Sequence, residues 1–465
     1  MPATKARDRV SPARACALRV VRRVFEEGAY ADRAFAGEAA RLGPRDRALA
    51  MALSYGTVQR RATLDHVASA LLDRPLERLD PPVLAVLRLG LFEILYLGGS
   101  AEHAAVNENV ELAKRTRPHA AGLVNAVLRR AVREGPQMLG RLDDSAPEAA
   151  GVVLSGAAGH SEPGASVHSA ALLHSVPGWL ASQWWQELGA EEAQGLLRVI
   201  NQPAESALRV NSLVSSAADV AVALPVPSRP ASGLPEGLVL DGPFDIQGSE
   251  LWRQGAIQPQ SRASMLVSRV LGPEPGQRTL DLCAAPGGKT THLAALMEDR
   301  GEIVAVERHP GRAAALERTA ARLRASSVRV EVGDAAAPRA SESFHRVLVD
   351  PPCSGLGTLQ SRPDLRWRAR PVAIGELAAL QAQILASGAD AVAPGGLLVY
   401  SVCTISRAEG PDLIDAFLQR RPDFAAEPID EERPELRHAR SGPGVQLLPH
   451  RDGTDGFFIA RLRRR

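Results

Sequence analysis

The stretch "LDLCAAPGGKTTHLAAL", residues 280–296, decides the fold of the C-terminal part of this chain. An apolar run predicts a strand, a loop of small residues follows, and apolar residues at helical spacing predict a helix. A loop between a parallel strand and the next helix lies at the carboxyl edge of the sheet, where such folds bind ligands. The stretch therefore predicts an α/β domain with a ligand site at this loop.

The loop itself has the residue types of a site lined by the main chain. Gly287 and Gly288 lack side chains, so a ligand can approach the backbone, and Pro286 stiffens the turn. The first turn of the following helix offers unpaired N–H groups to an anionic group. The predicted loop residues are Cys283, Ala284, Ala285, Pro286, Gly287, Gly288 and Lys289.

Two familiar nucleotide-binding motifs do not fit this loop. "GGKT", residues 287–290, ends like a phosphate-binding P-loop, but that motif requires Gly at position 283, which is Cys. A Gly-x-Gly-x-x-Gly motif does not occur either. The remaining candidate is a nucleoside cofactor with a small carboxylate, such as S-adenosylmethionine (SAM). Its carboxylate is small enough for the two glycines and Lys289.

From about residue 262 apolar, strand-like runs alternate with amphipathic helices, as in a parallel sheet covered on both faces. The predicted strands cover 278–283, 301–307, 328–334, 345–350 and 395–403, and the helices cover 290–299, 310–325 and 372–393. A closing pair at 444–450 and 456–464 predicts an antiparallel hairpin at one edge. Glu307 ends the second strand, where a ribose-binding acid is expected, and Asp334 ends the third, where it can accept from an adenine amine.

Asp350 ends the fourth predicted strand in "VLVDPPCSG", residues 347–355. The two prolines provide no backbone donors and force a rigid, extended exit, against which a planar nucleobase can lie. Cys353 follows this turn, and Cys403 ends the fifth strand. If these two strands are neighbours, both thiols face the same cleft beside the cofactor loop.

Two thiols at such a place suit methylation of carbon 5 of cytosine. That carbon is a poor nucleophile until a thiolate adds to carbon 6, and it then attacks the methyl donor. A base must remove the carbon-5 proton before the enzyme thiol can leave. One cysteine would be the nucleophile, the other would aid release, and Asp350 would favour attack. The residues alone leave the two cysteine roles open.

The rest of the chain predicts two further domains and a linker. Residues 1–135 show apolar stripes at helical spacing, which predicts a helical domain, and residues 136–172 are a linker rich in Gly, Ala, Ser and Pro. Short helices and strands over 173–255 predict a small α+β subdomain, and 256–465 form the α/β domain. Residues 1–140 carry 22 Lys and Arg against 15 Asp and Glu, which suggests a phosphate-rich partner.

Composition excludes several classes of protein. With 465 residues, 45% of them hydrophobic, the chain is long enough for two or three globular domains. No apolar run reaches the ~18 residues of a membrane helix, and the N-terminus lacks the apolar run of a secretory signal. A cytoplasmic protein with no membrane contact is expected. The four cysteines form no zinc-ligand pattern, so no metal is expected.

These motifs resemble the Sun/Fmu family of RNA 5-methylcytosine methyltransferases, and in particular its bacterial 16S rRNA enzymes with an N-terminal NusB-like domain. The stretches that carry the resemblance are "LDLCAAPGGKTTHLAAL", "VLVDPPCSGLGT", "RPDLRWR" and "LLPHRDGTDGFFIARL", with "RDRALAMALSYGTVQRR" and "LRLGLFEILYL" in the helical part. The resemblance implies a NusB-like all-α domain, a small α+β subdomain and a Rossmann-like class I SAM-dependent methyltransferase domain. It also implies an rRNA substrate, free or partly assembled into the subunit, and a monomeric enzyme.

The resemblance implies roles position by position. Residues 283–289 would hold SAM, with Glu307 at the ribose and Asp334 at the adenine edge. Asp350 would sit between cofactor and base. Cys403 would be the nucleophile, with Cys353 aiding release.

Alternatives and departures remain beside these roles. The alternatives are the same chemistry on tRNA or 23S rRNA, or a non-catalytic RNA-binding assembly factor. Three features depart from the family pattern: Val402 and Thr404 replace the usual Thr and Ser around the nucleophile, Glu307 replaces an Asp, and "IQPQSRAS" precedes the first strand.

Overall fold

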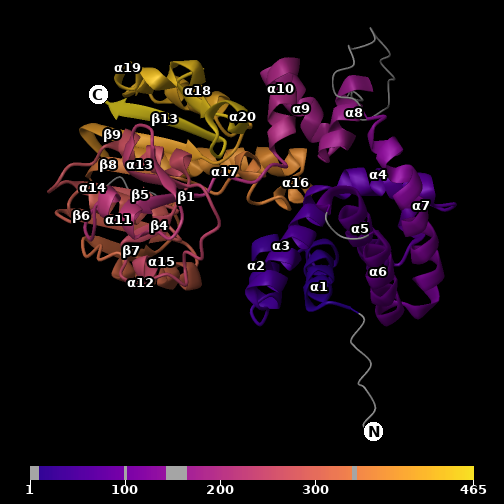
Figure 1. Ribbon diagram of the computed structural model, residues 1–465. Coiled ribbons are helices and arrows are strands. Elements are labelled where there is room, and N and C mark those ends of the chain that lie inside the picture. Colours follow the sequence, from indigo (N-terminus) through magenta and orange to yellow (C-terminus); the bar gives the residue numbers. More distant parts are fainter. Residues whose placement is uncertain (1–9, 99–101, 143–164, 338–342) are drawn as a thin grey trace. The chain divides into compact units, whose positions relative to one another are not determined.

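The computed structural model describes residues 10–98, 102–142, 165–337 and 343–465. The chain divides into two compact units (Figure 1). The first comprises Met1–Gln202 together with Leu359–Arg368, and the second comprises Pro203–Thr358 together with Ala369–Arg465. Most of the predicted linker, residues 143–164, lies outside the described residues.

The first unit is helical throughout its described residues, as predicted for the N-terminal domain. Prolines at the first positions of α1, α3 and α5 have no N–H to leave unpaired, which suits a helix start. The α-helices are α1 (Pro12–Glu26), α2 (Ala31–Glu38), α3 (Pro44–Gln59), α4 (Arg61–Leu71), α5 (Pro81–Phe92), α6 (Glu102–Thr116), α7 (Ala121–Leu139), α8 (Ala165–His174), α9 (Gly178–Leu188), α10 (Ala190–Val199) and α16 (Leu365–Arg368). Short helical turns cover Leu76–Arg78, Glu93–Leu97 and Pro118–Ala120.

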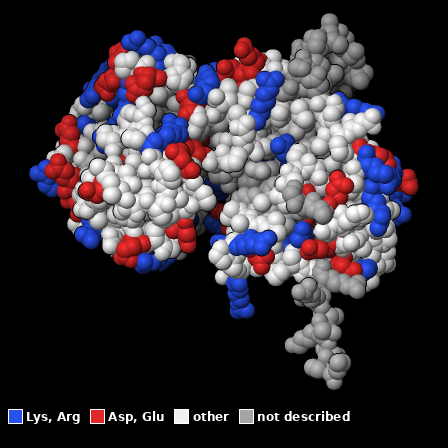
Figure 2. All heavy atoms as spheres, viewed as in Figure 1, with Lys and Arg blue, Asp and Glu red and all other residues white. Residues whose placement is uncertain are grey.

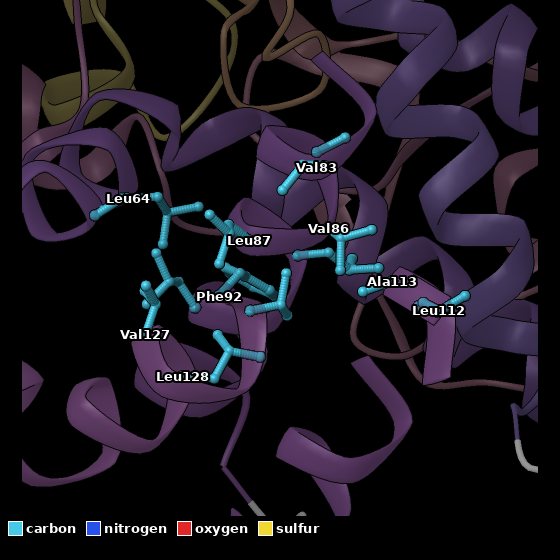
Figure 3. Close-up of a cluster of buried hydrophobic side chains, with 14 of the residues drawn as sticks. Leu64, Val83, Val86, Leu87, Phe92, Leu112, Ala113, Val127 and Leu128 are labelled. Carbon is cyan, nitrogen blue, oxygen red and sulfur yellow. The ribbon is translucent and has the colours of Figure 1, made fainter. Parts of the chain in front are cut away.

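The core of this unit forms around α5, whose apolar residues are buried on nearly every side. Figure 3 shows Leu64 of α4, Val127 and Leu128 of α7 and Leu87 of α5 pointing toward one another. Close helix approach requires small residues here, because a Cβ on Gly90 would lie 2.8 Å from a Leu128 methyl carbon. The helical spacing of apolar residues in the sequence is therefore the spacing that fills this core.

The short segment Leu359–Arg368 belongs to the helical unit although it is surrounded in sequence by the second unit. Arg366 is fully buried and donates to Asn201 Oδ1 at 2.8 Å and to the Ser175 carbonyl at 3.1 Å. Trp367 Nε1 donates to the Val58 carbonyl at 2.7 Å. The motif "RPDLRWR" thus anchors this segment among helices, because its Arg satisfies carbonyls that burial would otherwise leave unpaired.

Basic and acidic side chains are interspersed over the face of each unit that Figure 2 shows. Many form ion pairs along one helix, such as Arg22 with Glu26 at 2.8 Å and Arg130 with Glu134 at 3.0 Å. Such surface pairs contribute little stability. Each pair carries no net charge, so such pairs leave the basic excess of residues 1–140 unchanged.

The second unit begins with a four-stranded antiparallel sheet in the order β2-β3-β1-β4. Its strands are β1 (Ala207–Val210), β2 (Ser228–Ala231), β3 (Leu234–Leu240) and β4 (Ile257–Pro259), and its helices are α11 (Ala217–Ala223) and α12 (Glu250–Arg253). Strands β1, β2 and β3 lie within residues 173–255, for which the sequence predicts the small α+β subdomain, and β4 follows. Helices α9 and α10, predicted for the same subdomain, belong to the helical unit by their contacts. The boundaries at 135, 172 and 255 remain predictions.

A nine-stranded mixed sheet follows, with the path β11-β12-β13-β9-β8-β5-β6-β7 and β10 beside β13. The five predicted strands pair in parallel, and the closing pair is antiparallel as predicted, with β13 (the yellow arrow in Figure 1) against β9. The strands are β5 (Arg278–Leu282), β6 (Glu302–Glu307), β7 (Val328–Val332), β8 (Phe344–Val349), β9 (Val392–Val402), β10 (Phe424–Glu427), β11 (Arg440–Ser441), β12 (Gly444–Leu447) and β13 (Phe457–Arg464).

Helices cover both faces of this sheet, which explains its continuous apolar strands. On β8, Val347 and Val349 pack with α17 and α18, whereas Leu348 between them packs with α13 and α14. The helices are α13 (Arg262–Leu271), α14 (Gly288–Leu296), α15 (Pro310–Arg322), α17 (Pro371–Asp390), α18 (Pro411–Arg420), α19 (Ile429–Glu432) and α20 (Pro449–Asp452), with helical turns at Leu356–Thr358 and Pro434–Ala439. Among the described helices, only α17 is long and apolar enough to cross a membrane, and its Ile384 and Leu385 are buried in the core of the sheet.

Candidate active site at the carboxyl edge of the large sheet

The five parallel strands end side by side, in the order β7, β6, β5, β8 and β9. This order aligns the predicted site residues along one edge. Asp334 follows β7, Glu307 ends β6, Cys283 follows β5, Asp350 follows β8 and Cys403 follows β9. Residues that are up to 120 positions apart in sequence therefore share the edge at which ligands bind in such sheets.

The loop after β5 has a backbone that only small residues tolerate. Gly287 precedes α14 with φ of 99°, and a Cβ at this position would lie 2.4 Å from Leu316 Cδ1. Cys283 also adopts a left-handed φ, of 66°, at the end of the strand. The nearest atom to a Cβ on Gly288 would be Gln260 Oε1 at 3.9 Å, so the backbone is open on that side. The first N–H groups of α14 have no intrahelical acceptor and can bind a carboxylate.

The two acids predicted for the nucleoside differ in exposure. Glu307 is 2% exposed; its Oε1 accepts from the His309 N–H at 2.9 Å, and Arg312 lies 3.4 Å from its Oε2. Arg312 also donates to the Ala285 carbonyl at 2.6 Å, so this guanidinium links Glu307 to the glycine loop. Asp334 is exposed, and its Oδ1 accepts from the Ala336 N–H at 3.0 Å.

A partly buried ion pair joins the loop to the β8 end. Lys289 Nζ donates to Asp350 Oδ2 at 2.8 Å, and Ser401 Oγ donates to Asp350 Oδ1 at 2.8 Å. Burial disfavours the charge on Lys289, but the nearby Asp350 carboxylate outweighs that effect and raises the pKa of Lys289. Lys289 therefore stays cationic at the centre of the edge, 5.3 Å from the ring centroid of Phe457.

The two cysteine sulfurs are in contact, 3.3 Å apart. Both side chains are partly buried, and all four cysteines of the chain are free thiols. The hydrogen bond from Cys353 lowers the pKa of Cys403 and, with the charge of Lys289, outweighs burial and the charge of Asp350, which raise it. The same contact and burial raise the pKa of Cys353, and the charge of Glu409 adds to this effect. The thiolate is therefore favoured on Cys403, with Cys353 as its S–H donor.

Three polar residues at this edge were missed by the sequence analysis: Asp281, Ser401 and Glu409. Asp281 is buried in β5 and accepts from Thr290 Oγ1 of α14 at 2.7 Å, which ties the strand to the helix across the loop. Asp281 and Ser401 interrupt apolar runs, "LDL" and "VYSV", and that interruption was a usable signal. Glu409 lies in a loop, where an acid is unremarkable in sequence.

The strand order and the glycine loop beside the Lys289–Asp350 pair define an α/β methyltransferase domain joined to a small α+β domain. The chain belongs to the 16S rRNA methyltransferase RsmB/F family, which it matches over residues 268–463. Residues 11–133 match the NusB family, and residues 176–247 match the ferredoxin-like domain of RsmF/B-like methyltransferases. The predicted fold class and enzyme class are thereby confirmed.

Similar proteins extend over nearly the whole chain. A probable ribosomal RNA small subunit methyltransferase B from Synechocystis is 35% identical over 97% of this chain and 99% of its own. Ribosomal RNA small subunit methyltransferase B from Thermus thermophilus is 38% identical over 90% of this chain and 89% of its own. The crystal structure of PH0851 aligns with 98% of this chain and 99% of its own, with a TM-score of 0.78 and 26% identity.

Proposed function

We propose that this enzyme transfers a methyl group from SAM to carbon 5 of a cytosine in 16S rRNA through a covalent cysteine–cytosine adduct. The observation that carries the proposal is the 3.3 Å contact between Cys353 and Cys403 beside the Lys289–Asp350 pair. Relatives named as small-subunit rRNA methyltransferases support the substrate class.

The residues at the edge fit SAM. Positive φ at Gly287 and the open backbone at Gly288 leave a cradle at the start of α14, where unpaired N–H groups and Lys289 match a carboxylate. Glu307 would bind the ribose once Arg312 releases it, and Asp334, already exposed, would face the adenine. When bound, SAM supplies an electrophilic methyl group.

Cys403 would act as the nucleophile because its pKa is the lowered one of the pair. Its thiolate would add to carbon 6 of cytosine, which makes carbon 5 nucleophilic. After methyl transfer a base removes the carbon-5 proton, and the Cys403–carbon bond breaks to return the thiolate. The S–H of Cys353, which keeps its proton, would donate to that departing thiolate and so aid release.

The other domains would hold the RNA. In a stacked helix the neighbouring bases cover the faces of the cytosine ring, so a thiolate cannot reach carbon 6. The target base therefore has to be unstacked into the site. The NusB-like domain and the ferredoxin-like domain would contribute the RNA-binding surfaces.

Bisulfite sequencing of total RNA from a deletion strain tests this proposal. One cytosine of 16S rRNA should lose its protection from conversion, and the gene for the wild-type chain should restore it. Loss of protection at a cytosine in tRNA or 23S rRNA would mean that this RNA, and not 16S rRNA, is the substrate. An unchanged pattern in all RNA would favour a non-catalytic assembly factor.

A further inference from the structure

Glu409 is a fully buried carboxylate on the loop that carries Cys403, residues 403–410, and it contacts the loop that carries Cys353. Its Oε1 accepts from the Ser354 N–H at 2.8 Å, and its Oε2 accepts from Ser354 Oγ at 2.5 Å. Thr404 Oγ1 lies 3.3 Å from the same Oε2 and 2.7 Å from Ser354 Oγ. Ser354 directly follows Cys353, and Thr404 directly follows Cys403. One carboxylate therefore bridges the two residues adjacent to the reactive thiols.

Gln381 and Tyr400 hold Glu409 itself in place. Gln381 of α17 donates from Nε2 to Glu409 Oε1 at 3.0 Å and to the Pro352 carbonyl at 3.0 Å. The Tyr400 hydroxyl donates to the Glu409 carbonyl at 2.7 Å and lies 3.1 Å from Gln381 Oε1. Because Tyr400 belongs to β9, the network joins helix, sheet and both loops.

Burying a carboxylate without a cation costs more free energy than a purely structural contact requires. A buried carboxylate loses its hydration, and a cation usually compensates for that loss. No ion pair among the described residues includes Glu409; its oxygens are satisfied by neutral donors instead. Neutral partners of similar shape would fill the same space at lower cost, so stability alone does not account for the carboxylate.

We propose that Glu409 is a positioning residue. It holds the Cys353 and Cys403 loops at the spacing at which one thiol can transfer a proton to the other. This proposal rests on the two-cysteine reaction proposed above. It assigns to Glu409, which lies on the Cys403 loop, the task of fixing this distance through Ser354 on the Cys353 loop, with Thr404 as a partner on its own loop.

The charge of Glu409 supports the same arrangement. The groups acting on Cys353 are Cys403, Glu409 and the backbone N–H of Gly355, with Tyr400 nearby. The groups acting on Cys403 are Cys353, Asp350, Lys289 and Asp455. Lys289, the one cation in these two sets, acts on Cys403 together with the anions Asp350 and Asp455, whereas the anion Glu409 acts on Cys353. Glu409 therefore helps to keep the proton on Cys353.

The test measures the distance between the thiols without RNA or SAM. Diamide oxidises two adjacent thiols to a disulfide, taking up two electrons and two protons and becoming the hydrazine. The rate at which the Cys353–Cys403 disulfide forms is measured by mass spectrometry of the linked peptides. In Glu409→Ala this rate should fall about 10- to 100-fold, because small displacements of a reacting pair are costly.

Two further variants separate the causes. In Glu409→Gln the amide oxygen can accept from Ser354 N–H and Gln381, and the amide N–H groups can donate to the two hydroxyls. This variant should stay within about threefold of wild type, since hydrogen bonding is preserved without the charge. Glu236→Gln is the matched control, because Glu236 is also buried but bonds to Arg269 at 2.5 Å, away from the cysteine loops.

An unchanged disulfide rate in Glu409→Ala overturns the proposal, and so does equal slowing in Glu236→Gln. If Glu409→Ala does not fold, Ser354→Ala and Thr404→Val replace it, and wild-type rates in both overturn the proposal. As a second readout, Glu409→Ala should lower kcat for methyl transfer while the KM for SAM stays unchanged. Because the disulfide assay uses no substrate, its result stands whether or not the proposed reaction is correct.

Discussion

Cys353 Sγ and Cys403 Sγ lie 3.3 Å apart although 50 residues separate them in the chain. The contact exists because β8 and β9 are parallel neighbours, so the loops after both strands leave the sheet at the same edge. At this distance one sulfur can donate to the other. Once one of the two thiols has lost its proton, the remaining proton lies between the two sulfurs, and the surrounding charges decide which sulfur is the thiolate.

Replacing Cys403 by alanine should abolish methyl transfer and leave SAM binding nearly unchanged. The reason is that the predicted nucleophile is lost while residues 283–289, which would hold SAM, keep their backbone. Methyl transfer to RNA and SAM affinity by calorimetry are the two measurements. Retained turnover in Cys403→Ala would eliminate this assignment.

Replacing Cys353 by alanine should accumulate a protein–RNA adduct, because the departing Cys403 thiolate loses its S–H donor. The adduct would appear as a band that resists denaturant on a gel of protein mixed with RNA and SAM. Cys16→Ala is the matched control, since Cys16 is buried in the helical unit. An adduct in Cys403→Ala instead would mean that the two roles are reversed.

Replacing Lys289 by methionine should raise the pKa of Cys403. This change removes the cation that favours the thiolate and leaves the charge of Asp350 nearby uncompensated. Each unit of increase lowers the thiolate fraction at neutral pH about tenfold, and the rate of alkylation by iodoacetamide falls with it.

The pH profile of Cys403 alkylation, read by peptide mass spectrometry, measures this effect. Lys114→Met removes a lysine that pairs with Glu111 at 2.7 Å in the helical unit, and it should leave the profile unchanged. An unshifted profile in Lys289→Met would show that Lys289 does not act on the thiol.

Asp281 should make the second unit less stable as pH rises. Burial raises the pKa of Asp281 to about 7, above its ordinary value of 3.8, despite the hydrogen bond from Thr290. A carboxyl whose pKa is higher in the folded state than in the unfolded state stabilises the folded state. This contribution to the free energy of unfolding is fully present below pH 4 and is lost as pH rises through 7. The shift of about 3 units corresponds to as much as ~4 kcal/mol.

Asp281→Asn should flatten the fall in unfolding temperature between pH 5 and pH 8, measured by calorimetry. Asp299→Asn is a control of opposite sign, because hydrogen bonds from Ser326 and Ser327 lower the pKa of Asp299 against the effect of burial. Its effect should be confined to acid pH. Equal slopes for wild type and Asp281→Asn would refute the prediction.

Much of the fold follows from local sequence pattern. The five parallel strands, the helices between them and the closing antiparallel pair were all predicted, because apolar periodicity and turn residues act over a few neighbours. The position of each acid and cysteine at a strand end follows from the same pattern.

Other features depended on contacts between distant segments. The sequence did not indicate that α9, α10 and Leu359–Arg368 pack with the helical unit, because membership of a core depends on which apolar faces meet. Glu409 was missed for the same reason, since its partners Ser354 and Gln381 lie 55 and 28 residues away.

The chain's local chemistry thus specified which groups stand at the edge of the large sheet: a glycine loop, three acids, a lysine and two thiols. Folding decided which of these groups touch. Whether Cys353 or Cys403 carries the charge could not be read from the residues, because a thiol pKa depends on burial and on charges a few ångströms away. Lys289 acts on Cys403 and Glu409 acts on Cys353 only after the three loops that follow β5, β8 and β9 have come together.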